Sequence, residues 1–184
     1  MIKNNTTNGW IELICGPMFS GKTEELIRRL RRSLIAKKKV IIFKPYTDNR
    51  YSENKIVSHN NNSIDSIMIK NIEEILLLSE DADVIGIDEI QFFDNEIVEI
   101  CDSLANNGKR VIAAGLDKDY TTKAFGPMPL ILSTAEYVTK LYAICVICGI
   151  HAHFTKRISN EDSQVVVGEK DKYQARCRAC YHKE

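Results

Sequence analysis

The chain has 184 residues, of which 44% are hydrophobic and 27% are charged, and its 25 basic and 25 acidic side chains balance to a formal net charge of zero. This composition is typical of a globular protein, and the balanced charge argues against nucleic acid or a membrane surface as a partner. The apolar runs are far shorter than the roughly 20 residues that a membrane-spanning helix requires. The polar start predicts a flexible leader over residues 1–9 without a signal core, so we expect a cytoplasmic protein.

Strand and helix patterns alternate along most of the chain. Short apolar runs of strand-forming residues are separated by segments in which apolar residues recur at helical spacing. In chain order, the predicted elements are a strand over 10–15, a helix over 23–38, a strand over 39–45, a strand and a helix within 59–80, a strand over 83–89, a helix within 94–108 and a strand over 109–115. This alternation predicts an α/β fold, a mostly parallel sheet flanked by helices. A boundary near Tyr142 separates this domain, residues 10–141, from a smaller domain over 142–184.

The helix predicted over 23–38 is amphipathic. Its apolar residues at helical spacing are Leu26, Ile27, Leu30, Leu34 and Ile35. The basic residues of the run 28–39 fall mostly on the opposite side of the helix. This pattern favours a solvated face over a subunit contact, and over nucleic-acid binding in a chain without net charge.

A glycine-rich loop follows the first strand. Residues 16–23, GPMFSGKT, match the phosphate-binding pattern G-x-x-x-x-G-K-[ST] between a predicted strand and a predicted helix, which is the context that the pattern requires. Backbone N–H groups and the positive end of the helix dipole favour phosphate there. Lys22 would bridge the terminal phosphates of a nucleoside triphosphate, and the Thr23 hydroxyl would bind Mg²⁺. The candidate nucleotide-binding residues are Gly16, Pro17, Met18, Phe19, Ser20, Gly21, Lys22 and Thr23.

Two acidic residues end the strand predicted over 83–89. In phosphate-loop enzymes an acidic residue at the end of a nearby strand orients Mg²⁺, a role that suits Asp88. Glu89 would then lie beside the phosphates, where it could take a proton from an attacking hydroxyl group or water. The alternative is a strand end with two solvated acids, which the phosphate loop makes less attractive.

Apolar and aromatic side chains surround these motifs in the sequence. Met18 and Phe19 lie inside the phosphate loop, Phe92 and Phe93 follow the two acids, and residues 115–126 follow the last predicted strand. Open α/β sheets bind ligands at the strand ends, and a dry apolar pocket suits a flat organic acceptor rather than water. Any one of these side chains could instead belong to the ordinary core.

Two C-x-x-C pairs lie in the last third of the chain, Cys145 with Cys148 and Cys177 with Cys180, separated by the 28 residues 149–176. Four thiolates in a chain of intracellular character predict a tetrahedral structural zinc that closes a long loop. Disulfides are the less favoured alternative.

The other candidate ligands and thiols receive no metal role. Four cysteines already complete a zinc coordination shell, so His151, His153 and His182 are interpreted as bystanders. Cys15 and Cys101 lie in apolar segments and are predicted to be buried thiols.

Taken together, the ordered motifs resemble the cellular-type (type II) thymidine kinase family. They are GPMFSGKT, DNRYS (residues 48–52), DEIQFF, GLDKDY, FGPMP and the paired cysteines, and the resemblance covers about residues 9–181. Each motif alone is weak, but their order along one chain is highly specific. The resemblance implies a phosphate-loop sheet followed by a small zinc-binding, ribbon-like domain with a lasso loop.

The resemblance also implies an activity and residue roles. It implies transfer of the ATP γ-phosphate to the 5′-hydroxyl of thymidine, with deoxyuridine as a second substrate. Glu89 corresponds to the general base, Asp88 to the Mg²⁺-associated acid, and Gln91 lies close enough to join the nucleotide site. Asp48 and Arg50 match residues that act near the sugar and the phosphates.

The pocket for the base is implied in the same way. Positions that match residues around the base are Met18, Leu116, Tyr120 and Phe125, with Phe92 as the stacking aromatic residue, Thr155 and Tyr173 from the zinc-bound part, and the backbone of Gln164, Val167 and Gly168 from the lasso. A backbone N–H and carbonyl can read the edge of a pyrimidine while aromatic rings hold its faces. Tyr120 departs from the phenylalanine that is common in the family.

Further partners are implied only by the family: thymidine triphosphate as a feedback inhibitor and a homotetrameric assembly. Two other functions remain open at this point. A phosphate-loop ATPase with a zinc ribbon acting on nucleic acid would use water as the acceptor. A zinc-ribbon binding module without activity would leave the phosphate loop and the two acids unexplained.

Overall fold

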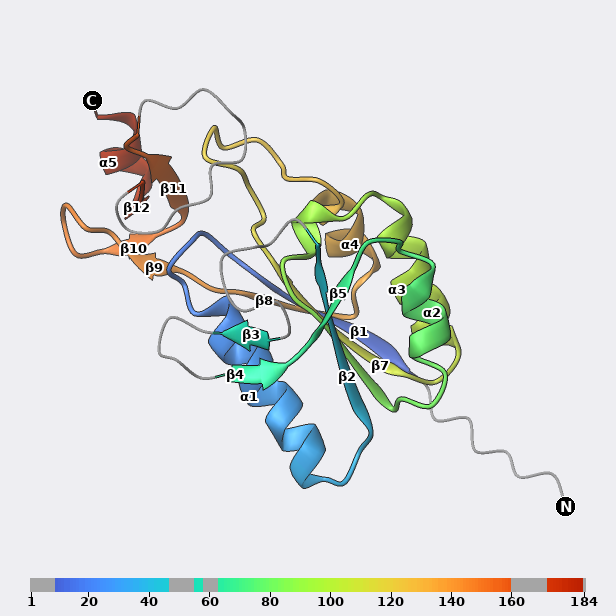
Figure 1. Cartoon of the computed structure of the whole chain (residues 1–184). Helices are drawn as coiled ribbons and strands as arrows, with labels where there is room; N and C mark the ends of the chain where they lie inside the picture. The colour runs from blue at the N-terminus through green and yellow to red at the C-terminus, as the bar shows by residue number, and fades with distance from the viewer. Residues whose placement is uncertain (1–8, 47–54, 58–62, 160–171, 184) are drawn as a thin grey trace, which may run out of the picture.

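The computed structural model describes residues 9–46, 55–57, 63–159 and 172–183. Its centre is a six-stranded sheet in the order β5-β2-β6-β7-β1-β8, and every adjacent pair of these strands is parallel (Figure 1). The strands are β1 (Trp10–Cys15), β2 (Val40–Pro45), β5 (Ile67–Ile69), β6 (Val84–Ile87), β7 (Arg110–Gly115) and β8 (Tyr137–Lys140). The predicted α/β fold with a parallel sheet is confirmed.

Helices connect the strands, and short antiparallel pairs complete the described chain. The helices are α1 (Lys22–Ile35), α2 (Glu74–Leu78), the 3-10 turn η1 (Ile90–Phe92), α3 (Glu96–Asn106), α4 (Met128–Thr134) and α5 (Arg178–His182). The antiparallel strands are β3 (Lys55–Val57) with β4 (Ser63–Asp65), β9 (Ala143–Ile144) with β10 (His151–Ala152), and β11 (Phe154–Arg157) with β12 (Tyr173–Arg176). Within the described part of the chain, none of the helices combines the length and the hydropathy that crossing a membrane requires.

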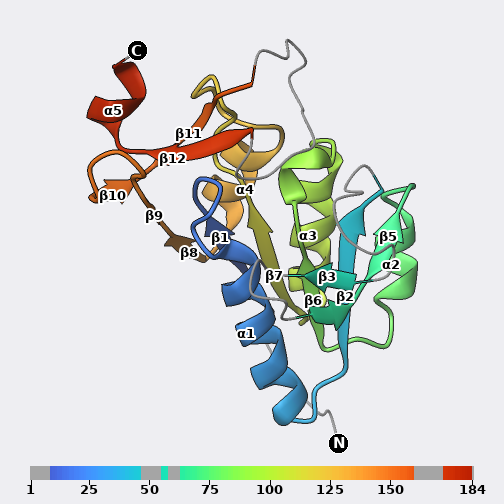
Figure 2. The ribbon, with the colours of Figure 1, turned by 60° about the vertical axis from the view of Figure 1, so that its left-hand side comes forward.

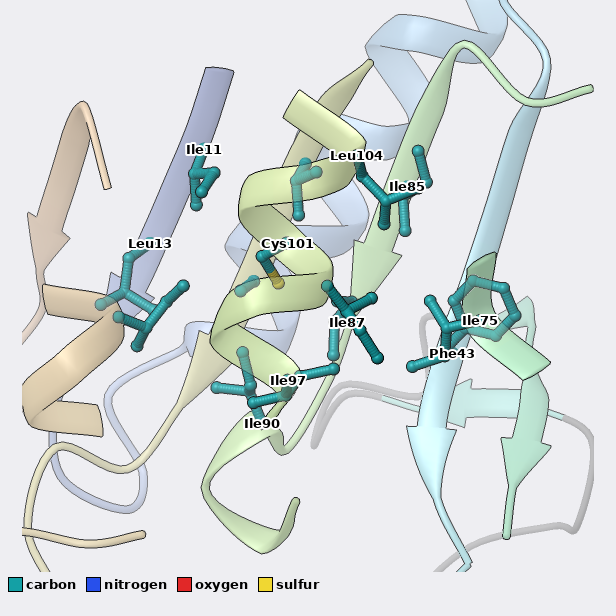
Figure 3. Close-up of a cluster of buried hydrophobic side chains, with 14 of the residues drawn as sticks. Ile11, Leu13, Phe43, Ile75, Ile85, Ile87, Ile90, Ile97, Cys101 and Leu104 are labelled. Carbon is teal, nitrogen blue, oxygen red and sulfur yellow. The ribbon is translucent and has the colours of Figure 1, made fainter. Parts of the chain in front are cut away.

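Alternate strand residues point to two apolar clusters, one on each face of the sheet. On one face, Ile85 and Ile87 of β6 pack against α3, where Cys101 and Leu104 are buried (Figure 3). On the other face, α1 buries Leu26, Ile27 and Leu30 against Ile14, Ile42, Val84, Ile112 and Ala114. The central strands are therefore mostly apolar, because both of their faces are covered.

The apolar face of α1 is shorter than the sequence predicted. Leu30 is fully buried, but Leu34 and Ile35 are 46% and 81% exposed, so their assignment to the apolar face was wrong. Val40 and Val84, which begin β2 and β6, already pack in the same cluster as Leu30, so the last turn of α1 extends past the apolar surface.

One basic residue of α1 is also not solvated. Arg29 is only 13% exposed and donates to the Glu12 carboxylate of β1 over 2.8 Å. Arg110 of β7 donates to the same carboxylate over 2.6 Å, and these bonds, against the opposing effect of burial, hold the pKa of Glu12 below its ordinary value.

Two elements of the sheet region were not predicted. The segment after β7 contains α4, and β8 pairs with β1 at the edge of the sheet. Tyr137 and Val138 of β8 are exposed. Because this edge strand is short and not buried on both faces, its sequence lacks the long apolar run by which the central strands were recognised.

The chain leaves the sheet directly after β8. The Leu141 N–H donates to the Cys15 carbonyl over 2.8 Å, and β9 begins two residues later. We refer to the described residues up to 141 as the α/β body and to 142–159 with 172–183 as the C-terminal module. In Figures 1 and 2 the module lies beside the loop that joins β1 to α1.

Candidate nucleotide and metal sites

The loop of residues 16–23 leaves the carboxyl end of β1 and enters α1, as predicted. Gly16 has φ 147°, and a Cβ on it would lie 2.5 Å from the Leu141 carbonyl oxygen. Only glycine allows this approach, so the base of the loop is packed against the segment that leads into the C-terminal module.

Side chains of the loop converge on one carbonyl group. The Lys22 ammonium and the Ser20 hydroxyl both donate to the Pro17 carbonyl over 2.8 Å. Lys22 is also the first residue of α1, where the backbone N–H groups and the dipole favour an anion. This ammonium is therefore within the volume in which the terminal phosphates of a nucleotide would be bound.

The acidic residue after β6 faces the loop. Asp88 is 6% exposed, and its carboxylate accepts from the Thr23 hydroxyl over 3.4 Å and from the Glu89 N–H over 3.0 Å. A hydroxyl and a carboxylate on neighbouring elements are the oxygen donors that Mg²⁺ prefers beside phosphates. Thr23 and Asp88 therefore fit the metal of a nucleotide–Mg²⁺ complex.

Glu89 adopts a left-handed backbone conformation with φ 51°. For a residue with a Cβ this conformation costs about 1–2 kcal/mol and persists only where the surroundings impose it. The Gln91 side-chain N–H donates to the Glu89 carboxylate over 2.5 Å, and the Leu116 N–H donates to the Gln91 side-chain oxygen over 3.0 Å. Because that backbone donor fixes which end of the amide is oxygen, the buried Gln91 orients the Glu89 carboxylate.

A small hollow of about 40 Å³ opens at the loop. Its lining residues are Met18, Phe19, Ser20, Gly21, Lys22, Thr23, Glu24, Glu89 and Leu116. The phosphate loop, the candidate base and apolar side chains therefore face one volume. A larger hollow of about 840 Å³ lies along β2 and β5, but its lining contains none of the predicted site residues, so we assign the chemistry to the smaller one.

Two aromatic residues of the predicted base pocket contact each other. The rings of Phe92 and Phe125 pack edge to face with their centroids 5.4 Å apart. The loop that carries Phe125 can approach η1 because the next residue is Gly126, where a Cβ would lie 2.3 Å from the Gln91 carbonyl oxygen. The pair therefore forms an apolar wall next to Gln91 and Glu89.

The tip of the phosphate loop contacts the C-terminal module. The Met18 N–H donates to the Thr155 hydroxyl of β11 over 3.0 Å. Phe19, which has φ 65°, packs against the buried cluster of the module. The module is therefore part of the surroundings that impose the conformation of this loop.

Tyr120 is held by the same module. The Arg157 guanidinium lies 3.7 Å from the centroid of the Tyr120 ring, within the range of a cation–π contact, and donates to the Tyr173 hydroxyl over 2.8 Å. The Tyr181 hydroxyl donates to the Tyr120 carbonyl over 2.6 Å. The loop after β7 and the strands β11 and β12 thus meet around Tyr120.

The four cysteines of the two C-x-x-C pairs lie together, as predicted. The sulfur atoms of Cys145, Cys148, Cys177 and Cys180 all lie within 4.8 Å of one another, and those of Cys148 and Cys177 are 3.6 Å apart. Tetrahedral zinc with bonds of about 2.3 Å would separate its sulfur ligands by about 3.8 Å, whereas a disulfide needs about 2.05 Å. All of these cysteines are free thiols, so the cluster fits one metal ion and not a disulfide.

Backbone groups surround the Cys145 sulfur. Burial raises the pKa of this thiol, but hydrogen bonds from the backbone at Cys177, Ile147 and Cys148 outweigh it and lower the pKa to about 6. Thiolates are the form of cysteine that binds metal.

The predicted bystanders lie outside this cluster. Cys15 and Cys101 are fully buried, as predicted, and burial raises the pKa of both thiols, that of Cys101 to about 12. The His151 ring stacks on Tyr142 with centroids 3.7 Å apart, and His182 packs at the edges of other aromatic rings.

The family profile described as thymidine kinase matches residues 9–181, nearly the whole chain. The chain belongs to the thymidine kinase family. It is 53% identical over 181 residues to a thymidine kinase of Rhodothermus sp. (strain ITI 518), with 98% of this chain and 85% of that protein covered. It is 51% identical over 182 residues to a thymidine kinase of Bacteroides fragilis (strain YCH46), with coverages of 99% and 92%.

Some positions that the thymidine kinase resemblance singled out cannot be placed. The residues that lie outside the described ranges are Asp48, Arg50, Gln164, Val167 and Gly168. The described candidates from the phosphate loop, from η1 and from the loop after β7 come together at the carboxyl edge of the sheet, and Thr155 and Tyr173 reach the same region from the module.

Two residues near this site were missed. Lys44, the last residue but one of β2, is only 1% exposed, and the pairing of Phe43 with Ile87 puts its backbone next to that of Asp88, the residue that follows β6. A lysine in an otherwise apolar strand was the available signal. Arg157 gave no local signal, because its contact with Tyr120 depends on the tertiary fold.

Proposed function

We propose that this protein transfers the γ-phosphate of ATP to the 5′-hydroxyl of thymidine and so produces thymidine monophosphate in nucleotide salvage. Deoxyuridine is a second substrate in this proposal. One observation carries it within the thymidine kinase family: Glu89 and the phosphate loop line the same hollow, and Gln91 orients the Glu89 carboxylate.

The phosphate loop and α1 bind the triphosphate. Backbone N–H groups from Phe19 to Thr23 and the positive end of the α1 dipole face the phosphates, and Lys22 exchanges its bond with the Pro17 carbonyl for a phosphate oxygen. Thr23 and Asp88 would hold, through their oxygen atoms, the Mg²⁺ that enters with ATP. Bound there, the ion would supply positive charge beside the phosphates.

Glu89 acts as the general base. It accepts the proton of the 5′-hydroxyl while the hydroxyl oxygen forms a bond to the γ-phosphorus, and the bond from that phosphorus to the bridging oxygen breaks with its electrons leaving on ADP. Gln91 keeps the carboxylate in place through its 2.5 Å hydrogen bond. The Leu116 N–H in turn holds Gln91.

Apolar residues of the body hold the thymine base. Phe92 stacks on the ring, and Met18, Leu116, Tyr120 and Phe125 pack around it. The remaining proposed contacts are Thr155 and Tyr173 from the module, the backbone of Gln164, Val167 and Gly168 at the base edge, and Asp48 with Arg50 near the sugar and phosphates. Excluding water from this pocket protects ATP from hydrolysis.

The four cysteines hold a structural Zn²⁺. Their sulfur atoms within 4.8 Å of one another support this assignment, because zinc takes four thiolates in a tetrahedron. The ion ties together both ends of residues 149–176. The division near Tyr142, with 10–141 as the kinase domain and 142–184 as the zinc-bound lasso domain, belongs to the same proposal.

The family resemblance supports three further parts of the proposal. These are inhibition by thymidine triphosphate, assembly as a homotetramer and a location in the cytoplasm.

The proposal is tested by finding which molecule accepts the γ-phosphate of ATP. Purified protein is incubated with γ-labelled ATP and Mg²⁺ and with thymidine, deoxycytidine, deoxyguanosine or no nucleoside. We expect label in thymidine monophosphate and none in the other nucleosides. Label that appears only as free phosphate, with or without nucleoside, would mean that water is the acceptor and that the protein is an ATPase.

A further inference from the structure

The phosphate loop is held from outside the α/β body. Its base is packed at Gly16 against Leu141, and its tip donates from the Met18 N–H to the Thr155 hydroxyl over 3.0 Å. Thr155 is 6% exposed and belongs to β11, so the loop and its partner are 137 residues apart in the sequence.

Phe19 gives a second contact of the same kind. Its left-handed backbone, φ 65°, is unfavourable for a residue with a side chain, and the loop keeps it where the ring packs against the module. The buried cluster that receives the ring consists of Ala143, Cys145, Ala152, Ala175, Cys177 and Cys180. Two successive residues of the loop are therefore fixed by the module.

The hydrogen bond also decides which backbone groups serve the nucleotide. Since the Met18 N–H is directed to Thr155, the phosphates are left to the N–H groups from Phe19 onward. The curvature that turns these groups inward begins at Met18 and Phe19. A loop released from the module would sample other conformations and would have to be ordered again on binding ATP.

We propose that Thr155 is a positioning residue for ATP: its hydroxyl fixes the phosphate loop in the conformation that binds the triphosphate. This inference rests on the proposed function and adds a second role to a residue otherwise assigned to the thymidine pocket. The proposed role belongs to the hydroxyl group and not to the methyl group.

Two substitutions separate the contribution of the Thr155 hydroxyl group from that of its methyl group. Thr155→Val keeps the shape and the methyl group but removes the acceptor hydroxyl, whereas Thr155→Ser keeps the hydroxyl and removes the methyl group. Calorimetry on the full chain, with Mg²⁺ present and thymidine absent, measures the dissociation constant of a non-hydrolysable ATP analogue. Steady-state kinetics give the KM values for ATP and for thymidine. Thr134→Val, which removes a hydroxyl that donates to Leu130 within α4, is the matched control.

We expect Thr155→Val to weaken nucleotide binding about 3- to 10-fold, as the loss of one hydrogen bond would, and to raise the KM for ATP but not for thymidine. In Thr155→Ser and Thr134→Val the dissociation constant of the ATP analogue should remain within about 2-fold of the wild-type value, since each leaves this bond in place. Phe19→Ala should weaken nucleotide binding in the same direction as Thr155→Val.

Unchanged nucleotide affinity in Thr155→Val would overturn the inference. Equal weakening by Thr155→Val and Thr155→Ser would also overturn it, because the effect would then come from packing. Neither result touches the kinase proposal, which fails instead if the wild-type protein does not bind the analogue or does not label thymidine.

Discussion

The α/β body and the C-terminal module are held together by different means. The body buries large aliphatic side chains on both faces of its sheet, among them Leu13, Ile85 and Leu30. Among the described residues, the buried cluster of the module consists of three alanines and three cysteines, with Phe19 of the body packed against it, and the larger side chains Phe154 and Tyr173 are buried outside this cluster. Small side chains bury little apolar area, so we expect the module to depend on the proposed zinc and on the body, whereas the body has a core of its own.

The largest expected effect follows from removing a metal ligand. In Cys177→Ser the zinc content should fall from about one ion per chain to nearly none, because a structural zinc loses its affinity with its ligand set. We expect the module to lose its protection from proteolysis while circular dichroism still reports the helices of the body. Cys101→Ala, which changes a buried thiol of α3 outside the metal site, should keep its zinc.

The contrast between a body with its own core and a module that depends on zinc would be wrong if Cys177→Ser retained one tightly bound zinc, or if the body unfolded together with the module in that variant.

The next effect concerns the chemistry of the body. Glu89→Gln keeps the shape of the side chain but removes the base, so turnover should fall about 10²- to 10⁴-fold while ATP binding persists. Rapid-quench kinetics and calorimetry measure the two properties. Glu99→Gln on the exposed surface of α3 is the control and should keep its turnover. Near-normal turnover in Glu89→Gln would show that Glu89 is not the general base.

A third prediction tests the core of the body. Leu30→Ala removes a fully buried side chain from α1 and should lower the free energy of unfolding by about 2–5 kcal/mol. Leu34→Ala changes a side chain on the same helix that is 46% exposed, and should cost much less. Urea unfolding followed by circular dichroism measures both. Equal losses would show that the body does not depend on this cluster.

The smallest effect lies on the surface of α1. The Arg28 guanidinium donates to Glu25 and, against the opposing effect of burial and with help from Arg29, lowers the Glu25 pKa from 4.5 to about 2. Since the pKa in the folded state is the lower one, this stabilisation is present above pH 4.5 and is lost as the pH falls toward 2.

We expect Glu25→Gln to cost about 1 kcal/mol at pH 7, because the pair with the 56% exposed Arg28 is screened and Arg29 keeps its bond to Glu12. Urea unfolding of the wild type and of this variant from pH 7 to pH 2 should show a difference that shrinks below pH 4.5. A difference that grows on acidification would contradict the pKa shift.

The parts of the fold that could be predicted from the sequence have local signals. Trp10–Cys15 was predicted with its observed bounds, because a buried parallel strand is a mostly apolar run and this one, apart from Glu12, stays apolar up to Gly16. The phosphate loop and the cysteine pairs were equally visible, since their spacing carries the chemistry. The edge strand β8 has exposed residues and no such run.

The contacts between the body and the module could not be predicted in this way. Met18 and Thr155 are 137 residues apart, and neither residue type indicates the other. The stack of Arg157 on Tyr120 has the same character. Such pairs depend on how the module packs against the body, which local patterns do not encode.

The most direct test is hydrogen exchange on the full chain before and after zinc is chelated. It asks whether the body stays folded without the metal, whether the module does not, and whether the module holds the phosphate loop. We predict that the amides of β6 and β7 keep their protection, that those of β11 and β12 lose it, and that the Met18 amide exchanges faster. Loss of protection in all four strands together, or an unchanged Met18 amide, would contradict this account.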